Sequence, residues 1–161
     1  MTTKLNKIKS QCEKLIEAGK FKNDSDYDTF SELIEELSEH KNNPEILRCF
    51  IKSFNEIDAG EIQYELVEAC EEFDDKIYVP IFLQEGLSFE KNAPSWFMLM
   101  FQTILNTKSC LKKFYELYPT LNETEQNFYL DIIRQIEKED GEYSKILKKT
   151  ETLKIDKKDE K

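Results

Sequence analysis

The chain has 161 residues, of which 39% are apolar and 35% are charged, and its net charge is −10. This length fits one compact domain with its own core, and no apolar run approaches the roughly 18–20 residues that a helix needs to cross a bilayer. A surface this negative repels nucleic acid and membranes and attracts cationic partners, so we expect a cytoplasmic protein that binds neither nucleic acid nor membrane.

Apolar residues recur at intervals of three and four along most of the chain, which is the pattern of amphipathic helices. Leu5, Ile8 and Cys12 begin this pattern, and Ile132 and Ile136 belong to a late stretch of it. The expected helices start near residues 3, 26, 44, 61, 77, 94, 108, 123 and 142. We therefore predict an all-α fold of about eight to nine short antiparallel helices. Both a HEAT-like helical-repeat stack, with a period of roughly 35 residues, and an irregular helical bundle fit this spacing.

Capping residues mark several of the expected helix boundaries. Asn43 and Asn92 each stand one or two residues before a proline, which is the order of an N-cap followed by proline in the first turn. Asn122, with a glutamate three residues later, has the arrangement of a capping box. We expect a single all-α domain over residues 1–150, followed by a polar tail, residues 151–161, that frays.

The segment NAPSWFMLMFQTILNT, residues 92–107, contains no charged residue. On a helical wheel its apolar side chains point in nearly every direction, and only Gln102 and Thr103 interrupt them. A helix that is apolar all round is a buried one, so we expect this helix in the middle of the domain and Trp96 in the core. A Met-rich ligand pocket is the alternative interpretation.

The sequence offers few residues from which a catalytic or metal site could be built. The four cysteines lie 20 residues or more apart, and one histidine, His40, is available to join them as a ligand; they are Cys12, Cys49, Cys70 and Cys110. We interpret them as reduced core residues and reject a disulfide framework and a zinc site. A phosphate-binding loop and a nucleophile elbow are also missing. We therefore predict no enzyme, no catalytic or metal-binding residues and no cofactor.

The stretch from Asn55 to Asp75 contains nine acidic residues and no Lys or Arg. On a helix that begins near Glu61, four glutamates line the side opposite Leu66 and Ala69, and Tyr64 falls on the acidic side. The candidate partner-binding residues are Asp58, Glu61, Tyr64, Glu65, Glu68, Glu72, Asp74 and Asp75.

Unpaired like charges at this helical spacing cost a few tenths of a kcal/mol per pair, so a helix built for stability alone would include lysines. We interpret the acidic side as a docking surface for a cationic partner, with Tyr64 as an aromatic anchor. A plain solvated face is the alternative. A second acidic helix, with Glu32, Glu35, Glu36 and Glu39, is the next candidate surface.

The order of motifs from Glu65 to Glu139 resembles a known family. An acidic-aromatic turn is followed by a tyrosine-led helix, an Ala-Pro-x-Trp entry and an Ile-Leu-Asn triplet; the residues are Glu72, Phe73, Asp74, Tyr78, Ala93, Pro94, Trp96, Ile104, Leu105 and Asn106. These features are similar to the α-helical immunity proteins of bacterial polymorphic-toxin and contact-dependent inhibition systems, in particular the group numbered thirty.

The resemblance implies a small cytosolic protein that binds one cognate toxin domain and occludes its active site. It implies no catalytic residues, and it makes Trp96 and Asn106 structural. Many toxins of these systems are nucleases, whose basic groove an acidic protein can cover. The competing function is a helical-repeat adaptor that holds a peptide or protein partner in a groove between helices. Whether the chain self-associates stays open.

Overall fold

The computed structural model describes residues 2–159, and the side chains of residues 3–155. All regular secondary structure in this range is helical: nine α-helices and three short 3-10 helices. The prediction of an all-α protein with about eight to nine helices is therefore confirmed. The chain forms two compact units, which meet in sequence between Gln102 and Thr103. The prediction of one domain over residues 1–150 stays a prediction, because two compact units can still unfold together.

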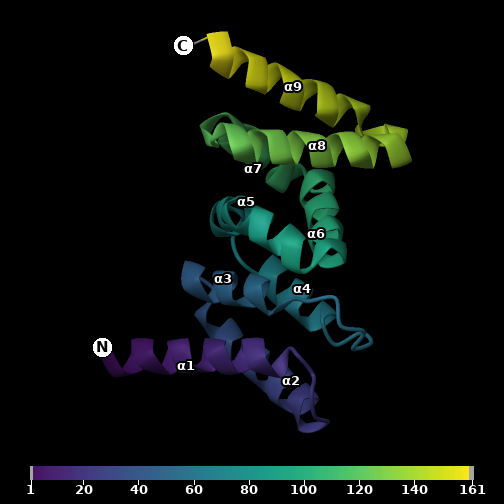
Figure 1. Ribbon diagram of the computed structural model, residues 1–161. Coiled ribbons are helices and arrows are strands. Elements are labelled where there is room, and N and C mark those ends of the chain that lie inside the picture. Colours follow the sequence, from purple (N-terminus) through teal and green to yellow (C-terminus); the bar gives the residue numbers. More distant parts are fainter. Residues whose placement is uncertain (1, 160–161) are drawn as a thin grey trace. The chain divides into compact units, whose positions relative to one another are not determined.

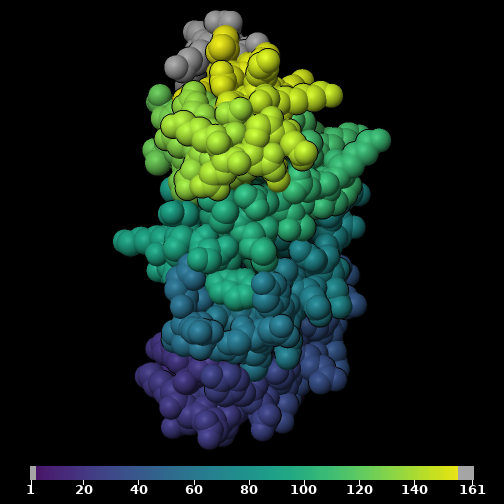
Figure 2. Space-filling model, turned by 90° about the vertical axis from the view of Figure 1, so that its right-hand side faces the viewer, coloured from purple at the N-terminus to yellow at the C-terminus, as the bar shows by residue number. Residues whose placement is uncertain are grey.

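The first unit contains five complete helices and the start of a sixth (Figure 1). Its elements are α1 Thr2–Ala18, α2 Ser25–Leu37, the 3-10 turn Ser38–His40, α3 Pro44–Ser53, α4 Tyr64–Glu71, α5 Asp75–Asn92 and the beginning of α6 Pro94–Asn106. Helix α1 packs against α2 and α3, α3 packs against α4 and α5, and α2 also contacts α4. In the space-filling view the side chains of this unit, coloured purple to teal, lie in contact along the face shown (Figure 2).

The second unit contains the end of α6, α7 Lys108–Leu117, the 3-10 turn Tyr118–Thr120, α8 Glu123–Glu139, the 3-10 turn Gly141–Tyr143 and α9 Ser144–Asp159. Helices α8 and α9 pack along each other (Figure 1). Helix α9 runs through residues 151–159, where we expect a frayed tail, and the fraying stays a prediction.

Two of the three predicted N-caps are confirmed. The Asn43 side chain accepts a hydrogen bond from the backbone N–H of Glu45 at 3.0 Å, and Asn122 accepts one from Glu125 at 2.8 Å. The prediction for Asn92 is wrong, because Asn92 is the last residue of α5 and only Ala93 separates it from α6. The hydrogen bond of the Ala93 N–H to the carbonyl of Phe89, at 2.8 Å, closes α5 and leaves Asn92 inside its last turn.

The prediction that α6 is buried on all sides is wrong for one face. Phe97, Met100 and Phe101 are buried, and Phe97 stacks on Phe82 of α5 with ring centroids 5.4 Å apart. Leu99, in contrast, is 37% exposed, and Trp96 is half-buried. Asn106, at the end of α6, donates a hydrogen bond to the Tyr143 hydroxyl at 2.9 Å.

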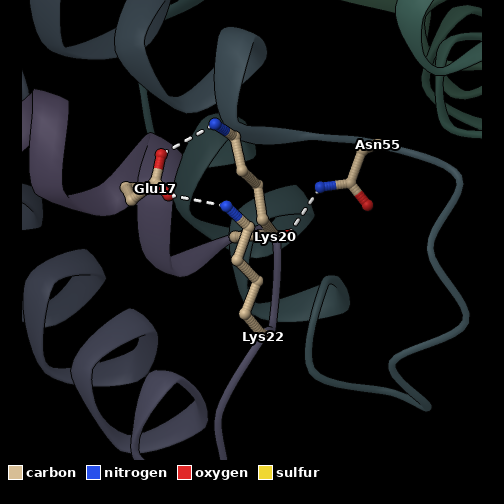
Figure 3. Close-up of polar contacts among 5 residues, drawn as sticks. Glu17, Lys20, Lys22 and Asn55 are labelled. Carbon is tan, nitrogen blue, oxygen red and sulfur yellow. Dashed lines mark hydrogen bonds and ion pairs between the residues drawn. The ribbon is translucent and has the colours of Figure 1, made fainter.

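The connection from α1 to α2 is held by charge pairs and by a close backbone approach (Figure 3). The Glu17 carboxylate pairs with Lys20 at 2.7 Å and with Lys22 at 3.3 Å, and the two ammonium groups lower its pKa. The Asn55 side chain donates to the carbonyl of Gly19 at 2.6 Å. A Cβ at Gly19 would lie 3.0 Å from the carbonyl oxygen of Ser53, so glycine allows α1 to end against α3.

Candidate partner-binding surface

Helix α4 places the predicted glutamates on the outside of the first unit. Its buried residues are Leu66, Val67, Ala69 and Cys70. Glu65 and Glu68 are exposed, and so are Glu61 before the helix and Glu72 after it. These four glutamates form what we call the acidic face. The alternation of apolar and acidic positions therefore orients this segment as the sequence analysis expects.

Helix α4 starts three residues later than predicted, at Tyr64, and ends at Glu71. The residues from Glu61 to Gln63 form a tight turn. The N–H of Tyr64 donates to the Glu61 carbonyl at 3.0 Å, and the N–H of Glu65 donates to the Ile62 carbonyl at 3.1 Å. At the other end, the Asp74 side chain accepts a hydrogen bond from the N–H of Lys76 at 2.8 Å and caps α5. Local capping thus limits α4 to eight residues.

Three of the predicted partner-binding residues take part in local structure. Asp74 is the N-cap of α5, as described above, and Asp75 is a partly buried residue in its first turn. Asp58 is exposed, and its side chain lies 3.4 Å from the N–H of Gly60, a residue with a φ of +69°. These three carboxylates stabilise turns and helix starts, so of the predicted set the four glutamates and Tyr64 are the residues best placed for a partner.

The acidic face borders a groove between α2 and α4, which we call the acidic groove. Its volume is about 340 Å³, and Ile34 and Ala69 contribute its apolar side chains. Its glutamates are Glu35 from α2 and Glu65, Glu68 and Glu72 from the α4 segment. The structure therefore brings Glu35, one residue of the second candidate surface, into a groove with three glutamates of the first, and Glu61 does not line this groove.

One lysine partly neutralises the acidic groove. The Lys41 ammonium lies 3.3 Å from the Glu72 carboxylate, and both side chains are at least half exposed. Glu61, Glu65 and Glu68 form no ion pair within the described part of the chain. Partial burial and then the Glu68 carboxylate raise the pKa of the neighbouring Glu71. The face thus concentrates negative charge that a cationic partner would relieve.

Tyr64 and Trp96 form an aromatic pair beside the acidic face. Tyr64 is 47% exposed, and its ring meets the Trp96 ring edge to face with centroids 5.0 Å apart. Trp96 in turn contacts Phe54, with centroids 5.6 Å apart. The prediction that Trp96 fills the core is therefore only partly right, because its ring packs on the buried Phe54 but keeps some exposure where the first turn of α6 meets α4.

The loop before α4 is organised by a buried glutamine that the sequence analysis does not single out. Gln63 is 1% exposed. Its side chain accepts from the N–H of Asn55 at 3.2 Å and donates to the carbonyl of Ile57 at 3.1 Å. These bonds shape the loop that leads into Tyr64. The sequence does contain a signal for this residue: Gln63 stands three and four residues before the buried Leu66 and Val67, at a position where the helical pattern calls for an apolar side chain.

A larger groove lies between α1 and α3, and we call it the thiol groove. Its volume is about 560 Å³, and its lining includes Leu5, Cys12 and Cys49 together with charged residues of both signs, among them Lys9 and Glu13. Cys12 is half-buried and Cys49 is buried. Their thiols share a hydrogen bond, which lowers the pKa of Cys12 and raises that of Cys49. The prediction that Cys12 lies in the core is thus only partly right.

The described residues offer no group of three or more His, Cys, Asp or Glu side chains that could hold a metal ion. Across residues 2–159, none of the helices combines the length and the apolar character needed to cross a membrane.

Comparison with known families agrees with the motifs of the sequence analysis. The sequence profile of a family described as immunity protein 30 matches residues 17–114. The match runs from the end of α1 into α7 and includes both the acidic face and the aromatic pair. It includes all the motif residues named above, from Glu72 to Asn106, and it reaches further toward the N-terminus than they do. No curated protein and no solved structure matches the chain.

Proposed function

The chain belongs to the immunity protein 30 family, and we propose that it neutralises one cognate bacterial toxin domain by stoichiometric binding through the acidic face. The partner is a basic protein domain, and a nuclease is the class we favour. A nuclease groove that binds phosphates is lined with cations, and these are the groups that exposed carboxylates attract. The protein acts in the cytoplasm as an inhibitor and performs no catalysis.

The observation that carries this proposal is the clustering of exposed carboxylates without matching cations. Residues 1–102 contain eleven Lys and Arg against twenty-one Asp and Glu, which is a net charge of −10. Glu65 and Glu68 lie on one helix face and share a groove with Glu35 of α2. Carboxylates so close together repel one another, and a basic partner reduces that repulsion when it binds.

The acidic charge also predicts how binding proceeds. Attraction between oppositely charged surfaces raises the association rate, and salt screens it over about 10 Å at 0.1 M. We therefore expect the association rate to fall steeply with added salt. Dissociation depends on short-range contacts and should change much less.

The test is reversal of the four glutamates of the acidic face. The variant Glu61→Lys, Glu65→Lys, Glu68→Lys and Glu72→Lys should bind the toxin at least about tenfold more slowly than the wild type. We expect the toxin to be the C-terminal domain of a large secreted protein encoded immediately upstream, and that domain is the one to use. Rapid-mixing kinetics measure association, and survival of cells that express the toxin measures protection. The melting temperature should stay within a few degrees, because each exposed change costs at most about 0.5 kcal/mol.

A matched control makes the same charge change in the second unit. Glu116, Asp131, Glu139 and Glu142 are all exposed, and their reversal to Lys gives the same net charge as reversal of the acidic face. This control should bind and protect nearly as the wild type does. If both variants lose binding equally, net charge alone drives association. If neither loses it, the toxin binds elsewhere.

A second candidate function, a helical-repeat adaptor, is favoured by the thiol groove. This groove is the larger of the two and is rimmed by Leu5, which is 65% exposed. An apolar peptide helix could lie between α1 and α3. In that case Leu5→Asp would abolish partner binding, and reversal of the acidic face would leave it intact.

A further inference from the structure

The aromatic pair is the outer end of a row of rings that begins in the core. Phe89 and Phe54 are 2% and 3% exposed and stack with centroids 5.2 Å apart. Phe54 contacts Trp96 at 5.6 Å, and Trp96 contacts Tyr64 at 5.0 Å. The row thus passes from two buried rings through a half-buried one to an exposed one. Packing against the core restrains Trp96 and Tyr64 before any partner arrives.

Polar contacts fix the backbone on both sides of this pair. The N–H of Ser95, next to Trp96, donates to the Glu56 carboxylate at 2.5 Å. The buried Gln63 holds the loop that leads into Tyr64, as described above. A side chain whose position is set in advance loses little conformational entropy on binding. Exposed Tyr and Trp rings of this kind are the residue types that dominate binding energy in protein interfaces.

The carboxylates around the pair define the chemistry of the group it would receive. Glu61 lies three residues before Tyr64, and Glu68 lies one helical turn after it; both are exposed. A guanidinium group is the cation that suits this arrangement, because it stacks on aromatic faces and pairs with carboxylates at its edge. A lysine ammonium is more strongly hydrated and lacks the planar face.

We propose that Tyr64 and Trp96 form the anchor of the toxin interface and receive an arginine side chain of the toxin, which stacks on the rings and pairs with Glu61 or Glu68. This inference rests on the proposed function and adds to it the position and the chemical class of the central contact. The acidic face then brings the toxin near, and the aromatic pair holds it.

The single tryptophan allows a direct test. Protein labelled with 5-fluorotryptophan has one ¹⁹F resonance, from position 96. The labelled full chain is titrated with the unlabelled toxin domain named in the binding test above, and calorimetry measures the affinity separately. We expect the resonance to shift and to stop shifting at one equivalent. If calorimetry detects no binding by the wild type, the proposed function fails, and this inference fails with it.

Substitutions at the exposed ring separate the anchor from its surroundings. Tyr64→Ala should weaken the affinity by about 30-fold or more, and Tyr64→Phe, which keeps the ring, should stay within about threefold of the wild type. Tyr27→Ala is the control, because Tyr27 is an exposed tyrosine of α2, also in the first unit, with an exposed fraction of 37%. One set of results would overturn the anchor and leave the proposed toxin binding intact. In it, the wild type binds the toxin, the ¹⁹F resonance does not move, and Tyr64→Ala and Tyr27→Ala have equal affinities.

The arginine is tested by double-mutant cycles. Each toxin arginine is changed to alanine and combined with Tyr64→Ala, and one of them should show a coupling of at least about fivefold in affinity. That coupling should persist in Tyr64→Phe, because stacking needs only the ring. If the strongest coupling partner is an apolar toxin residue instead, the guanidinium assignment is wrong.

Discussion

The two compact units differ in net charge. The first carries the whole net charge of −10, whereas the second has twelve basic and twelve acidic residues. The second unit pairs buried polar groups internally: the Tyr118 hydroxyl donates to the Gln126 carbonyl at 3.0 Å, and the Gln126 side chain donates to the Tyr118 carbonyl at 3.1 Å. The first directs carboxylates toward solvent. The proposed function therefore places the partner-binding surface in the first unit, where the net negative charge lies.

The family match follows the same division. It covers residues 17–114, which include most of the first unit and only the start of the second. Helices α8 and α9 lie beyond it. We therefore expect partner binding to depend on the first unit, and the second to contribute stability.

The largest effect we predict is the loss of a core ring in the first unit. Phe82 is fully buried and contacts Phe89, Phe97 and Phe101. Phe82→Ala should cost about 3–5 kcal/mol in the free energy of unfolding, because it removes apolar burial and leaves a cavity. Trp96→Ala should cost about half as much, because Trp96 is only half-buried. Denaturant titration measures both.

The same experiment tests the division into units. Probes placed in each unit should report one common transition if residues 1–150 form a single cooperative domain. Two transitions, with only the first moved by Phe82→Ala, would show that the units unfold separately. Equal costs for Phe82→Ala and Trp96→Ala would contradict the partial burial of Trp96.

A smaller loss is expected from the polar core of the second unit. Gln126 is 3% exposed and bonds to the Tyr118 carbonyl. Gln126→Leu should destabilise the protein by about 1 kcal/mol, because the Tyr118 carbonyl loses one of its two donors and keeps the N–H of Leu121. Toxin affinity, measured by calorimetry on the folded variant, should stay as in the wild type. A substantial loss of affinity would place part of the interface in the second unit.

The smallest effect concerns alkaline pH. Burial raises the pKa of Tyr118 to about 12, from an ordinary value near 10. A tyrosine whose pKa is higher in the folded state stabilises the fold fully below pH 10, and this contribution is lost as the pH rises through 12. The denaturant midpoint of the wild type should therefore fall between pH 10 and 12 more than that of Tyr118→Phe. Parallel curves for the two proteins would contradict the assigned pKa.

Local features of the sequence predicted most of the fold. Six of the nine expected helix starts lie within one residue of the observed ones, because proline, asparagine caps and the apolar period act over a few neighbouring residues. The expected start of α4 at Glu61 is wrong, because residues 61–63 form a tight turn and the residue spacing of such a turn resembles that of a helix. Asn92 fails as a cap because α5 continues to it. Such boundaries depend on competing hydrogen bonds of similar strength.

The sequence by itself determined that the chain is helical, that Glu65 and Glu68 face solvent, and which family it belongs to, since periodicity and motifs are local properties. Only the tertiary structure decided that Glu35 shares a groove with them and that Trp96 lies at the surface against Tyr64. The apolar period shows which side of a helix is buried, but it contains no information about which helix covers that side. Contacts between α2 and α4, and between α4 and α6, arise from packing among segments distant in sequence, and they place Glu35 beside the glutamates of α4 and Trp96 beside Tyr64.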